Sequence, residues 1–246
     1  SSQYKNSNAL FHLGNMYRDG FGGIQNLKIA VSYYKKSAKL NNSDAFFELG
    51  NYYFYYKKKK DFYRALQYYE KAANLQHSYA SLMTGNIYYF GIEVLPDYKK
   101  AKKYYKESAN QDNQYAMLML GFIFYYGFDN KCNYIKSKKW FEILAGKNNA
   151  DAFLMLGNLY YYGQNVEQNF SKAKDYYELS AKQENSYAFL MLGNMHFFGH
   201  GTHQDHKRVI DLFELSAQLN NPDAFLLLGN LYYLSGFISN NEKAKR

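Results

Sequence analysis

The chain repeats itself along its whole length. A Leu-Gly-Asn tripeptide, or a close variant of it, recurs seven times at intervals of 35 or 36 residues. Its glycines are Gly14, Gly50, Gly85, Gly121, Gly157, Gly193 and Gly229. A period of this length is typical of a solenoid, in which each repeat buries its apolar side only against neighbouring repeats. The sequence therefore predicts a long ordered surface rather than a pocket of catalytic groups.

Each repeat has the apolar spacing of two amphipathic helices. In repeat two, Ala45, Leu49 and Tyr53 share one helical face, and Ala65 and Tyr69 share a second. Alternation with a period of two residues appears nowhere at length, so the sequence predicts an all-α solenoid. We expect a single domain over residues 1–246, with repeats at 7–42, 43–77, 78–113, 114–149, 150–185 and 186–221 and an incomplete repeat at 222–246.

Polar residues and glycines at fixed positions indicate where the helices begin and end. Asn or Asp opens every second helix, because these side chains accept the free N–H groups at a helix start: Asn26, Asp61, Asp97, Asn133, Asn169 and Asp205. Glycines that suit a left-handed C-cap enter five of the loops: Gly20, Gly91, Gly127, Gly163 and Gly199. The return turns carry Asn42, His77, Asn113, Asn149, Asn185 and Asn221, and we expect the asparagines there at positive φ. Pro222 suits the first turn of a helix.

These patterns resemble the Sel1-like repeat, a relative of the tetratricopeptide repeat. The clearest copy joins Ala152–Gly163, AFLMLGNLYYYG, to Asn169–Ala181, NFSKAKDYYELSA. The resemblance covers the chain from about Ser7 to Arg246. It departs from the family pattern where the loop of repeat two lacks its glycine and where His196 replaces an aromatic residue. It implies a right-handed superhelix with the first helices on the concave side, and a non-enzymatic adaptor that assembles other proteins.

Composition narrows the class of protein further. The chain has 30 Lys and Arg against 21 Asp and Glu, a net charge of +9, and one cysteine, Cys132. A single cysteine excludes the disulfide-stapled secreted subgroup of the family. The sequence has no apolar run long enough to span a membrane and no phosphate-binding motif, and we expect no cofactor. An unpaired apolar helix is a poor terminus, so we expect a monomeric fragment of a longer chain, or a cap on the last helix.

The residue after each repeat glycine is Asn in six of the seven repeats. These residues are Asn15, Asn51, Asn86, Asn158, Asn194 and Asn230, and Phe122 is the exception. The family arrangement places this position in the concave groove. One amide offers an acceptor and two donors, so it can bond both the C=O and the N–H of a peptide backbone. We predict that this amide row holds an extended or helical segment of another protein. The alternative is that each Asn bonds the backbone of the neighbouring repeat or faces water.

Aromatic residues beside the amide row are candidates for selectivity. The first members of the doublets that follow the glycines are Phe54, Tyr89, Tyr125, Tyr161, Phe197 and Tyr233, and a second set is Tyr79, Tyr115 and Tyr187. Tyrosine is enriched at interfaces because its ring packs while its hydroxyl stays hydrated. We expect both sets to contact the partner, with Tyr89, Tyr125 and Tyr161 as hot spots. The alternative is that these rings form the core between repeats.

The same sequence bears on three other binding modes: an acidic partner, RNA and a zinc ion. The net positive charge is compatible with an acidic partner, although the lysines cluster on loops and second helices, on the outer side. RNA binding is disfavoured because the Asn column barely varies, whereas a base-reading code needs variation. A zinc site at His200, His203 and His206 is disfavoured because Gly199 and Gly201 break the helix between them. We expect neither a metal nor a small-molecule substrate.

A structural alternative is that the array is a spacer or docking arm of a larger protein and uses its outer or terminal surfaces.

Abundant Asn, Lys and Tyr indicate an AT-rich genome, such as that of an intracellular bacterium. We expect the protein in the cytoplasm, and a secreted effector that binds a host protein is the alternative.

Overall fold

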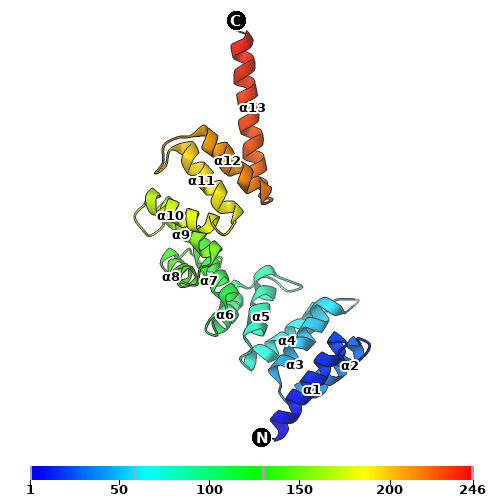
Figure 1. The fold of residues 1–246 in the computed structure, drawn as a ribbon. Coiled ribbons are helices and arrows are strands. Elements are labelled where there is room, and N and C mark those ends of the chain that lie inside the picture. Colours follow the sequence, from blue (N-terminus) through cyan, green and yellow to red (C-terminus); the bar gives the residue numbers. More distant parts are fainter. Residues whose placement is uncertain (1, 58, 129–130, 245–246) are drawn as a thin grey trace. The chain divides into compact units, whose positions relative to one another are not determined.

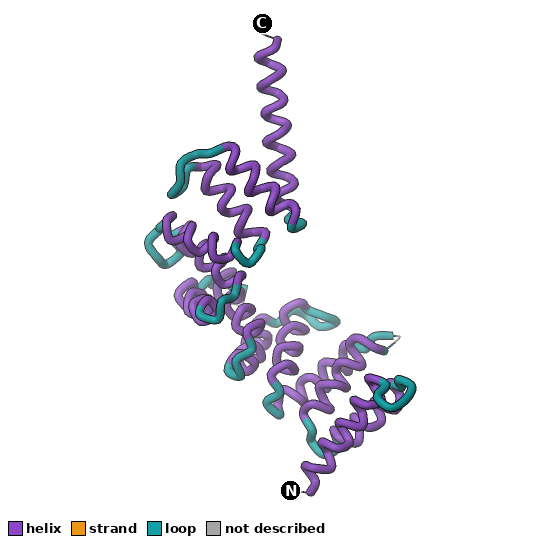
Figure 2. The backbone as a smooth tube through the Cα atoms, viewed as in Figure 1, coloured by secondary structure: helices purple, strands orange, loops and turns teal. Residues whose placement is uncertain are grey.

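The computed structural model describes the backbone of residues 2–57, 59–128 and 131–244 and the side chains of residues 6–57, 59–128 and 131–233. Within these ranges the chain forms helices and loops and no strand, which confirms the predicted all-α solenoid (Figure 1). Figure 2 shows that short loops join the helices throughout. The helices group into two compact units, Ser1–Cys132 and Asn133–Arg246. No helix in the described ranges combines the length and the apolar character that crossing a membrane requires.

The first unit contains three helix pairs and one further first helix. Its elements are α1 (Ser2–Asp19), α2 (Leu27–Ala38), α3 (Ser43–Asn51), the π-helical turn η1 (Tyr52–Tyr56), α4 (Phe62–Asn74), α5 (Ser78–Phe90), α6 (Tyr98–Ala109) and α7 (Gln114–Tyr126). Odd-numbered helices are the first helices of the repeats, and even-numbered helices are the second. The π-helical turn continues α3 in the repeat whose loop lacks a glycine, and the backbone becomes extended only at Lys57.

The second unit begins with a second helix and ends with the longest helix of the described chain. Its elements are α8 (Tyr134–Ala145), α9 (Ala150–Tyr162), α10 (Phe170–Ala181), α11 (Ser186–Phe198), α12 (His206–Gln218) and α13 (Pro222–Ala244). Pro222 is the first residue of α13, as predicted. The other first helices of this unit have 13 residues, whereas α13 continues as one helix of 23 residues.

The predicted helix caps are confirmed. The six Asn and Asp side chains before α2, α4, α6, α8, α10 and α12 each accept the backbone N–H three residues later, at 2.9–3.1 Å. Gly91, Gly127, Gly163 and Gly199 are the C-caps of α5, α7, α9 and α11, and each adopts the left-handed conformation. The loop between the helices of a repeat is therefore set by a glycine at one end and a carboxylate or amide at the other.

The expected positive φ of the return-turn asparagines is wrong by one residue. The residues at positive φ are Asn41, Gln76, Asp112, Asn148, Glu184 and Asn220, each one position earlier. Asn42, Asn113, Asn149 and Asn185 have negative φ and are N-caps, as is His77, whose Nδ1 accepts the N–H of Ala80. Asn221 likewise accepts the N–H of Asp223. An N-cap residue needs extended backbone, so the left-handed turn must come before it.

Small residues let the helices approach closely in the core. The alanines of the first helices and the small residues of the second helices are fully buried: Ala45, Ala80, Ala116, Ala152, Ala188, Ala224, Ala30, Ala65, Ala101, Ser137 and Ala173. The largest fully buried side chains include Tyr69, Tyr105 and Tyr177, which all lie on second helices. These rings determine the geometry of the amide row.

Candidate partner-binding face

Each first helix exposes one stripe of side chains. On α11, Tyr187, Asn194 and Phe198 are separated by seven and four residues, so they lie on one side of the helix. Tyr187 and Phe198 are exposed and Asn194 is half-buried. We call the equivalent stripes of each unit its first-helix face. In the first unit it comprises Asp44, Asn51 and Tyr55; Tyr79, Asn86 and Phe90; and Tyr115, Phe122 and Tyr126. In the second unit it comprises Asp151, Asn158 and Tyr162, and the α11 stripe.

In four repeats the amide of the row is bonded to a tyrosine of its own repeat. The hydroxyls of Tyr34, Tyr69, Tyr105 and Tyr177 donate to Oδ1 of Asn15, Asn51, Asn86 and Asn158, each at 2.8 Å. This arrangement is neither a bond to the neighbouring backbone nor hydration alone, the two alternatives that the sequence raised. The oxygen of each amide is engaged inside the fold, so the Nδ2 donors are what these four positions can offer to a partner.

The glycine before each Asn provides the seat for the same tyrosine ring. A Cβ atom on Gly50, Gly85 or Gly157 would lie 2.4–2.6 Å from the ring of Tyr69, Tyr105 or Tyr177, respectively. Such a distance is far inside van der Waals contact, so no larger residue fits while the ring is in place. The Gly-Asn dipeptide therefore makes two contacts with the tyrosine: the glycine leaves space for the ring, and Oδ1 of the Asn accepts the hydrogen bond from the hydroxyl.

Burial also keeps these hydroxyls protonated to a higher pH than a free phenol. It raises the pKa of Tyr34, Tyr69 and Tyr105 above the ordinary value of 10.0, because the ionised phenol would lose its hydration. The hydroxyls therefore stay protonated even above pH 10 and remain able to donate to the amide oxygen. A donated hydroxyl requires the oxygen of the amide, which leaves the Nδ2 group on the other side.

Two repeats depart from this pairing. Repeat four has Phe122 in place of the amide, and Phe141 in place of the tyrosine, so donor and acceptor are missing together. Repeat six keeps Asn194 but has Phe213 at the tyrosine position. The ring of Phe213 still lies against Gly193, where a Cβ atom would be 2.4 Å from Cε1. Repeat six therefore keeps the amide, and keeps a ring packed on the glycine, but lacks the hydroxyl that would bond the amide.

Burial separates the two members of the aromatic doublets in repeats four and five. Tyr125 and Tyr161, two of the expected hot spots, have only 9% and 8% of their surface exposed, whereas Tyr126 and Tyr162 are 55% and 56% exposed. A buried ring cannot seat in a partner without local unfolding. In repeats four and five the second member of the doublet is therefore the ring available to a partner, and sequence reasoning had selected the first.

The first member turns inward where the next helix begins with an aromatic residue. Tyr89 packs edge-on against Tyr98, with ring centroids 5.5 Å apart, and Tyr161 packs in the same way against Phe170 at 5.3 Å. Phe54 and Tyr89 are partly buried. Repeat six has His206 at the corresponding position, and there Phe197 is 36% exposed. The aromatic residue that follows the N-cap is the sequence signal that could have identified the buried member.

The remaining predicted aromatic residues are exposed. Tyr79, Tyr115 and Tyr187 present their rings to solvent near the starts of their helices, and Tyr233 does so on α13. The exposed rings at the opposite helix ends, which the prediction missed, are Tyr55, Phe90, Tyr126, Tyr162 and Phe198. Uncharged residues dominate between these two rows: α5, α7 and α11 contain no Asp, Glu, Lys or Arg, and α9 contains only Asp151.

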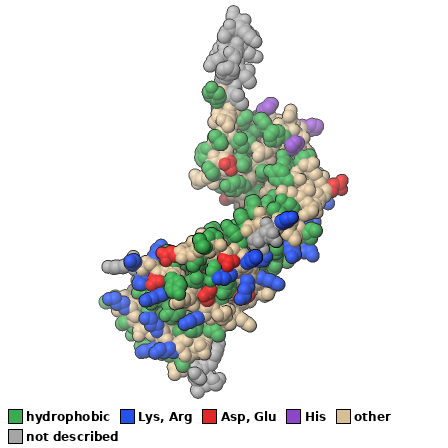
Figure 3. All heavy atoms as spheres, turned by 180° about the vertical axis from the view of Figure 1, so that it is seen from behind, with side chains coloured by type: hydrophobic (Ala, Val, Ile, Leu, Met, Phe, Trp, Pro, Cys, Tyr) green, Lys and Arg blue, Asp and Glu red, His purple; other side chains and the backbone are tan. Residues whose placement is uncertain are grey.

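Basic residues belong to the second helices and loops. The first unit, residues 1–132, has 18 Lys and Arg against 10 Asp and Glu, whereas residues 133–246 have 12 against 11. On the face of the first unit drawn in Figure 3, Lys and Arg are spread among apolar side chains. Several of these lysines lie over aromatic rings, such as Lys100 over Tyr88 at 4.7 Å and Lys103 over Tyr104 at 5.4 Å. Apart from α1, which carries Arg18, the first helices therefore contribute little of the charge that could attract an acidic partner.

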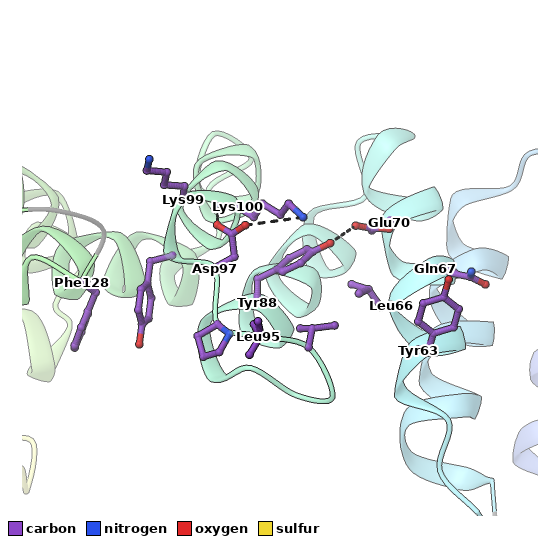
Figure 4. A pocket seen from close by; sticks show the side chains of 13 residues that line it. Tyr63, Leu66, Gln67, Glu70, Tyr88, Leu95, Asp97, Lys99, Lys100 and Phe128 are labelled. Carbon is purple, nitrogen blue, oxygen red and sulfur yellow. Dashed lines mark hydrogen bonds and ion pairs between the residues drawn. The ribbon is translucent and has the colours of Figure 1, made fainter.

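A cleft lies between the second helices α4 and α6, with a volume of about 770 Å³. Figure 4 shows Tyr88 directed at Glu70, whose carboxylate accepts its hydroxyl at 2.8 Å, and Asp97 beside Lys100 at 3.9 Å. Burial, with the nearby Glu70 carboxylate, raises the pKa of Tyr104 to about 12, and this hydroxyl also donates to Glu70. The polar groups of the cleft therefore hold neighbouring repeats together.

The histidines of repeat six are not arranged as metal ligands. The side chain of His200 is stacked on Phe170, with centroids 4.6 Å apart, and its Nδ1 lies 2.8 Å from the hydroxyl of Tyr161. His203 and His206 are exposed. Within the described ranges, no three His, Cys, Asp or Glu residues converge as a metal site would require. His200 instead packs the loop after α11 onto the preceding repeat.

Comparison with known proteins agrees with this architecture. The model of the Sel1 repeat family matches residues 7–42, 43–77, 78–113, 114–149, 150–185 and 186–221. Among curated proteins, none matches the chain in sequence.

Two crystal structures illustrate the likeness. A protective antigen of uropathogenic Escherichia coli strains that displays an SLR fold is 24% identical, with a TM-score of 0.84 over 93% of this chain and 50% of that one. The chain thus spans half the length of the antigen. A Sel1 repeat protein from Oxalobacter formigenes is 25% identical, with a TM-score of 0.69, over 87% of this chain and 88% of its own.

Proposed function

We propose that this chain, which belongs to the Sel1 repeat family, is an adaptor that holds a segment of another protein on its first-helix face. The family is generally non-enzymatic, and its fold is commonly a protein–protein interaction module. What this chain adds is a surface whose repeated chemistry is suited to a polypeptide.

The repeated exposure of large rings carries the proposal. Phe90 and Tyr126 in the first unit, and Tyr162 and Phe198 in the second, occupy the same position in successive repeats, and each keeps more than half of its surface exposed. An aromatic ring that stays in water forgoes the stabilisation that burial would give, roughly 25 cal/mol for each Å². Rings exposed in register, on helices almost without charge, are typical of an interface core, and aromatic residues dominate binding energy at such interfaces.

The amides supply register to the bound segment. With Oδ1 held by a tyrosine, Asn86 and Asn158 can donate from Nδ2 to a backbone carbonyl of the partner. One such bond contributes about 0.5–1.5 kcal/mol. The amides therefore position the segment, and the rings supply most of its affinity.

The composition of the face also constrains the partner. Because the first helices carry few charges, we propose an extended segment with apolar or aromatic side chains and little net charge. A helical segment fits less well, since its own backbone carbonyls are already bonded within the helix and cannot accept from a row of amides. An acidic partner would instead bind the lysine-rich second helices of the first unit, and that is the docking-arm alternative.

A displayed library of random peptides tests the proposal. Peptides of about a dozen residues are long enough, since an extended chain covers about 3.3 Å per residue and packed helices lie about 10 Å apart. Peptides enriched on the full chain are measured by fluorescence anisotropy against the double variant Tyr162→Ala, Phe198→Ala, whose two rings belong to the second unit. We expect binding to weaken at least about tenfold with the helical circular-dichroism signal unchanged.

A matched control removes exposed apolar side chains from second helices. Ile135 and Leu215 are exposed on α8 and α12 of the same unit, and their joint replacement by Ala should leave the affinity unchanged. Loss of binding in the control but not in the Tyr162, Phe198 double variant would establish the docking-arm alternative. A library from which no peptide is enriched would overturn the proposal.

A further inference from the structure

Repeat six contains an amide whose intramolecular partner has been removed. In repeat five, the hydroxyl of Tyr177 occupies Oδ1 of Asn158 at 2.8 Å. In repeat six, the ring at the same position is Phe213, which has no hydroxyl. The two rings sit alike on their glycines, because a Cβ atom on Gly157 or on Gly193 would be 2.4 Å from Cε1 of the ring. The difference between the two repeats is therefore one hydroxyl group, and the ring position is retained.

The side chain of Asn194 makes no hydrogen bond within the described part of the chain, and it is half-buried with its polar atoms accessible. Its Oδ1 and Nδ2 are both available, whereas Asn158 accepts the hydroxyl of Tyr177 at Oδ1 and donates from Nδ2 to the sulfur of Met155 at 3.7 Å. A polar group on a largely apolar face that is not satisfied by the protein must be satisfied by water or by a ligand.

The surroundings of Asn194 match those of the proposed interface. Along α11, the exposed rings of Tyr187 and Phe198 flank the amide, and Phe197 is partly exposed beside them. The helix contains no Asp, Glu, Lys or Arg. On the next first helix, α13, Leu226 and Tyr233 are exposed. The free amide therefore lies on an uncharged helix with exposed rings on both sides of it, and a bound segment would cover these side chains.

We infer that Asn194 holds the main chain of the bound segment through a pair of hydrogen bonds, and that Phe213 is the positioning residue that keeps this amide free. The inference rests on the proposed function and deepens it. In an extended segment, the N–H and C=O of one residue point to the same side, so Oδ1 can accept the N–H while Nδ2 donates to the C=O. The ligand class is an extended polypeptide bound at one residue by its backbone, and the flanking rings then select the adjacent side chains.

The substitution Phe213→Tyr tests the inference by restoring the missing hydroxyl. The new hydroxyl should bond Oδ1 of Asn194, as Tyr177 does with Asn158, and thereby compete with the N–H of the segment for that oxygen. For peptides enriched from the displayed library, we expect the affinity for Phe213→Tyr to fall roughly three- to tenfold. Asn194→Ala removes both bonds and should weaken the same peptides roughly ten- to hundredfold.

The double variant Asn194→Ala, Phe213→Tyr completes a cycle and separates the possible outcomes. Phe213→Tyr should raise the midpoint of urea unfolding when Asn194 is present and should not raise it when Ala stands there, which reports whether the new bond forms. In the Asn194→Ala background, Phe213→Tyr should not change the affinity.

Two results would overturn the inference while leaving the proposed function standing. One is a Phe213→Tyr protein that gains stability but binds the peptides as tightly as the wild type. The other is Asn194→Ala with unchanged affinity while the Tyr162, Phe198 double variant loses binding. If no peptide binds the wild-type chain, the proposed function itself fails.

Discussion

The ring of Tyr177 lies directly on the backbone of Gly157, and a Cβ atom on that glycine would stand 2.4 Å from Cε1 of the ring. The substitution Gly157→Ala should therefore destabilise the second unit, because either the ring or α9 must shift. Overpacking of this kind costs about 1–3 kcal/mol. The shift in the urea-unfolding midpoint, monitored by circular dichroism, measures it.

Gly229→Ala is the matched control for that prediction. Gly229 has the same place in the repeat motif, but apart from its sequence neighbours and the backbone of its own helix no described atom lies within 4 Å of the position that its Cβ would take. Because Ala favours a helix over Gly by about 1 kcal/mol, this substitution should be neutral or stabilising. Equal destabilisation by the two substitutions would show that the glycines serve something other than the ring seat.

The hydrogen bond between Tyr105 and Asn86 should couple the stabilities of their variants. Tyr105→Phe removes the donor and leaves the ring in place, and we expect a loss of about 0.5–1.5 kcal/mol. In a double-mutant cycle with Asn86→Ala, the two effects should be less than additive, because either change alone already breaks the bond. Strict additivity would indicate that the two groups do not interact in solution.

Alkaline pH should destabilise the protein through the buried tyrosines. Burial raises the pKa of Tyr69 and Tyr105 above the ordinary 10.0, so above about pH 10 the unfolded chain releases protons that the folded chain retains. The stabilising contribution is complete below pH 10 and is lost as the pH rises towards the folded-state pKa, at up to about 1.4 kcal/mol per pH unit for each group. Urea unfolding at pH 8–11.5 measures this loss.

The variant Tyr69→Phe lacks one of the buried hydroxyls, so its free energy of unfolding should fall less above pH 10 than that of the wild type. The free-energy difference between the two proteins should therefore shrink as the pH rises above 10. A difference that stays constant over the whole range would contradict the buried, protonated hydroxyl.

The turn residues at positive φ offer a stabilising substitution. Glu184 joins α10 to α11 with a φ of 58°, a conformation that costs a residue with a Cβ about 1–2 kcal/mol. Part of this cost is offset because Gly loses more backbone freedom on folding, so Glu184→Gly should stabilise by up to about 1 kcal/mol. Asn148→Gly, at a φ of 60°, should change the unfolding free energy less, because Asn tolerates this conformation. Urea unfolding of both variants and the wild type measures this: the midpoint should rise for Glu184→Gly and change less for Asn148→Gly.

The helices and their caps could be predicted from the sequence because they depend on local chemistry. Asp97 or Asn169 before an apolar stretch identifies a helix start without knowledge of the rest of the fold. The return turns were misplaced by one residue for the same reason: Asn suits both a left-handed turn and an N-cap, and Asn148–Asn149 provides one of each. Local preference alone does not separate two adjacent positions that favour the same residue.

The candidate site was harder to predict because its residues are defined by contacts between helices. The amide row was recognised, but the tyrosine that occupies each amide lies 18 or 19 residues later, on the second helix. Likewise, Tyr161 and Tyr162 are the same residue type, and only the packing of Phe170 determines which of them is buried. An alignment of repeats five and six gives part of the answer from sequence alone, because Tyr177 corresponds to Phe213 whereas the Asn of the amide row is present in both repeats.

Salt should have little effect on peptide binding to the first-helix face. Helices α5, α7 and α11 contain no Asp, Glu, Lys or Arg, so the proposed contacts are rings and amides, which counter-ions do not screen. Between 50 and 500 mM NaCl the Kd of an enriched peptide should change by less than about threefold. A partner on the lysine-rich α6, which carries Lys99, Lys100, Lys102, Lys103 and Lys106, would depend on screened charges, and its affinity should fall at least about tenfold over the same range. Anisotropy titrations at three salt concentrations distinguish the two surfaces. A Kd that rises steeply with salt would indicate that the peptide binds the second helices and not the first.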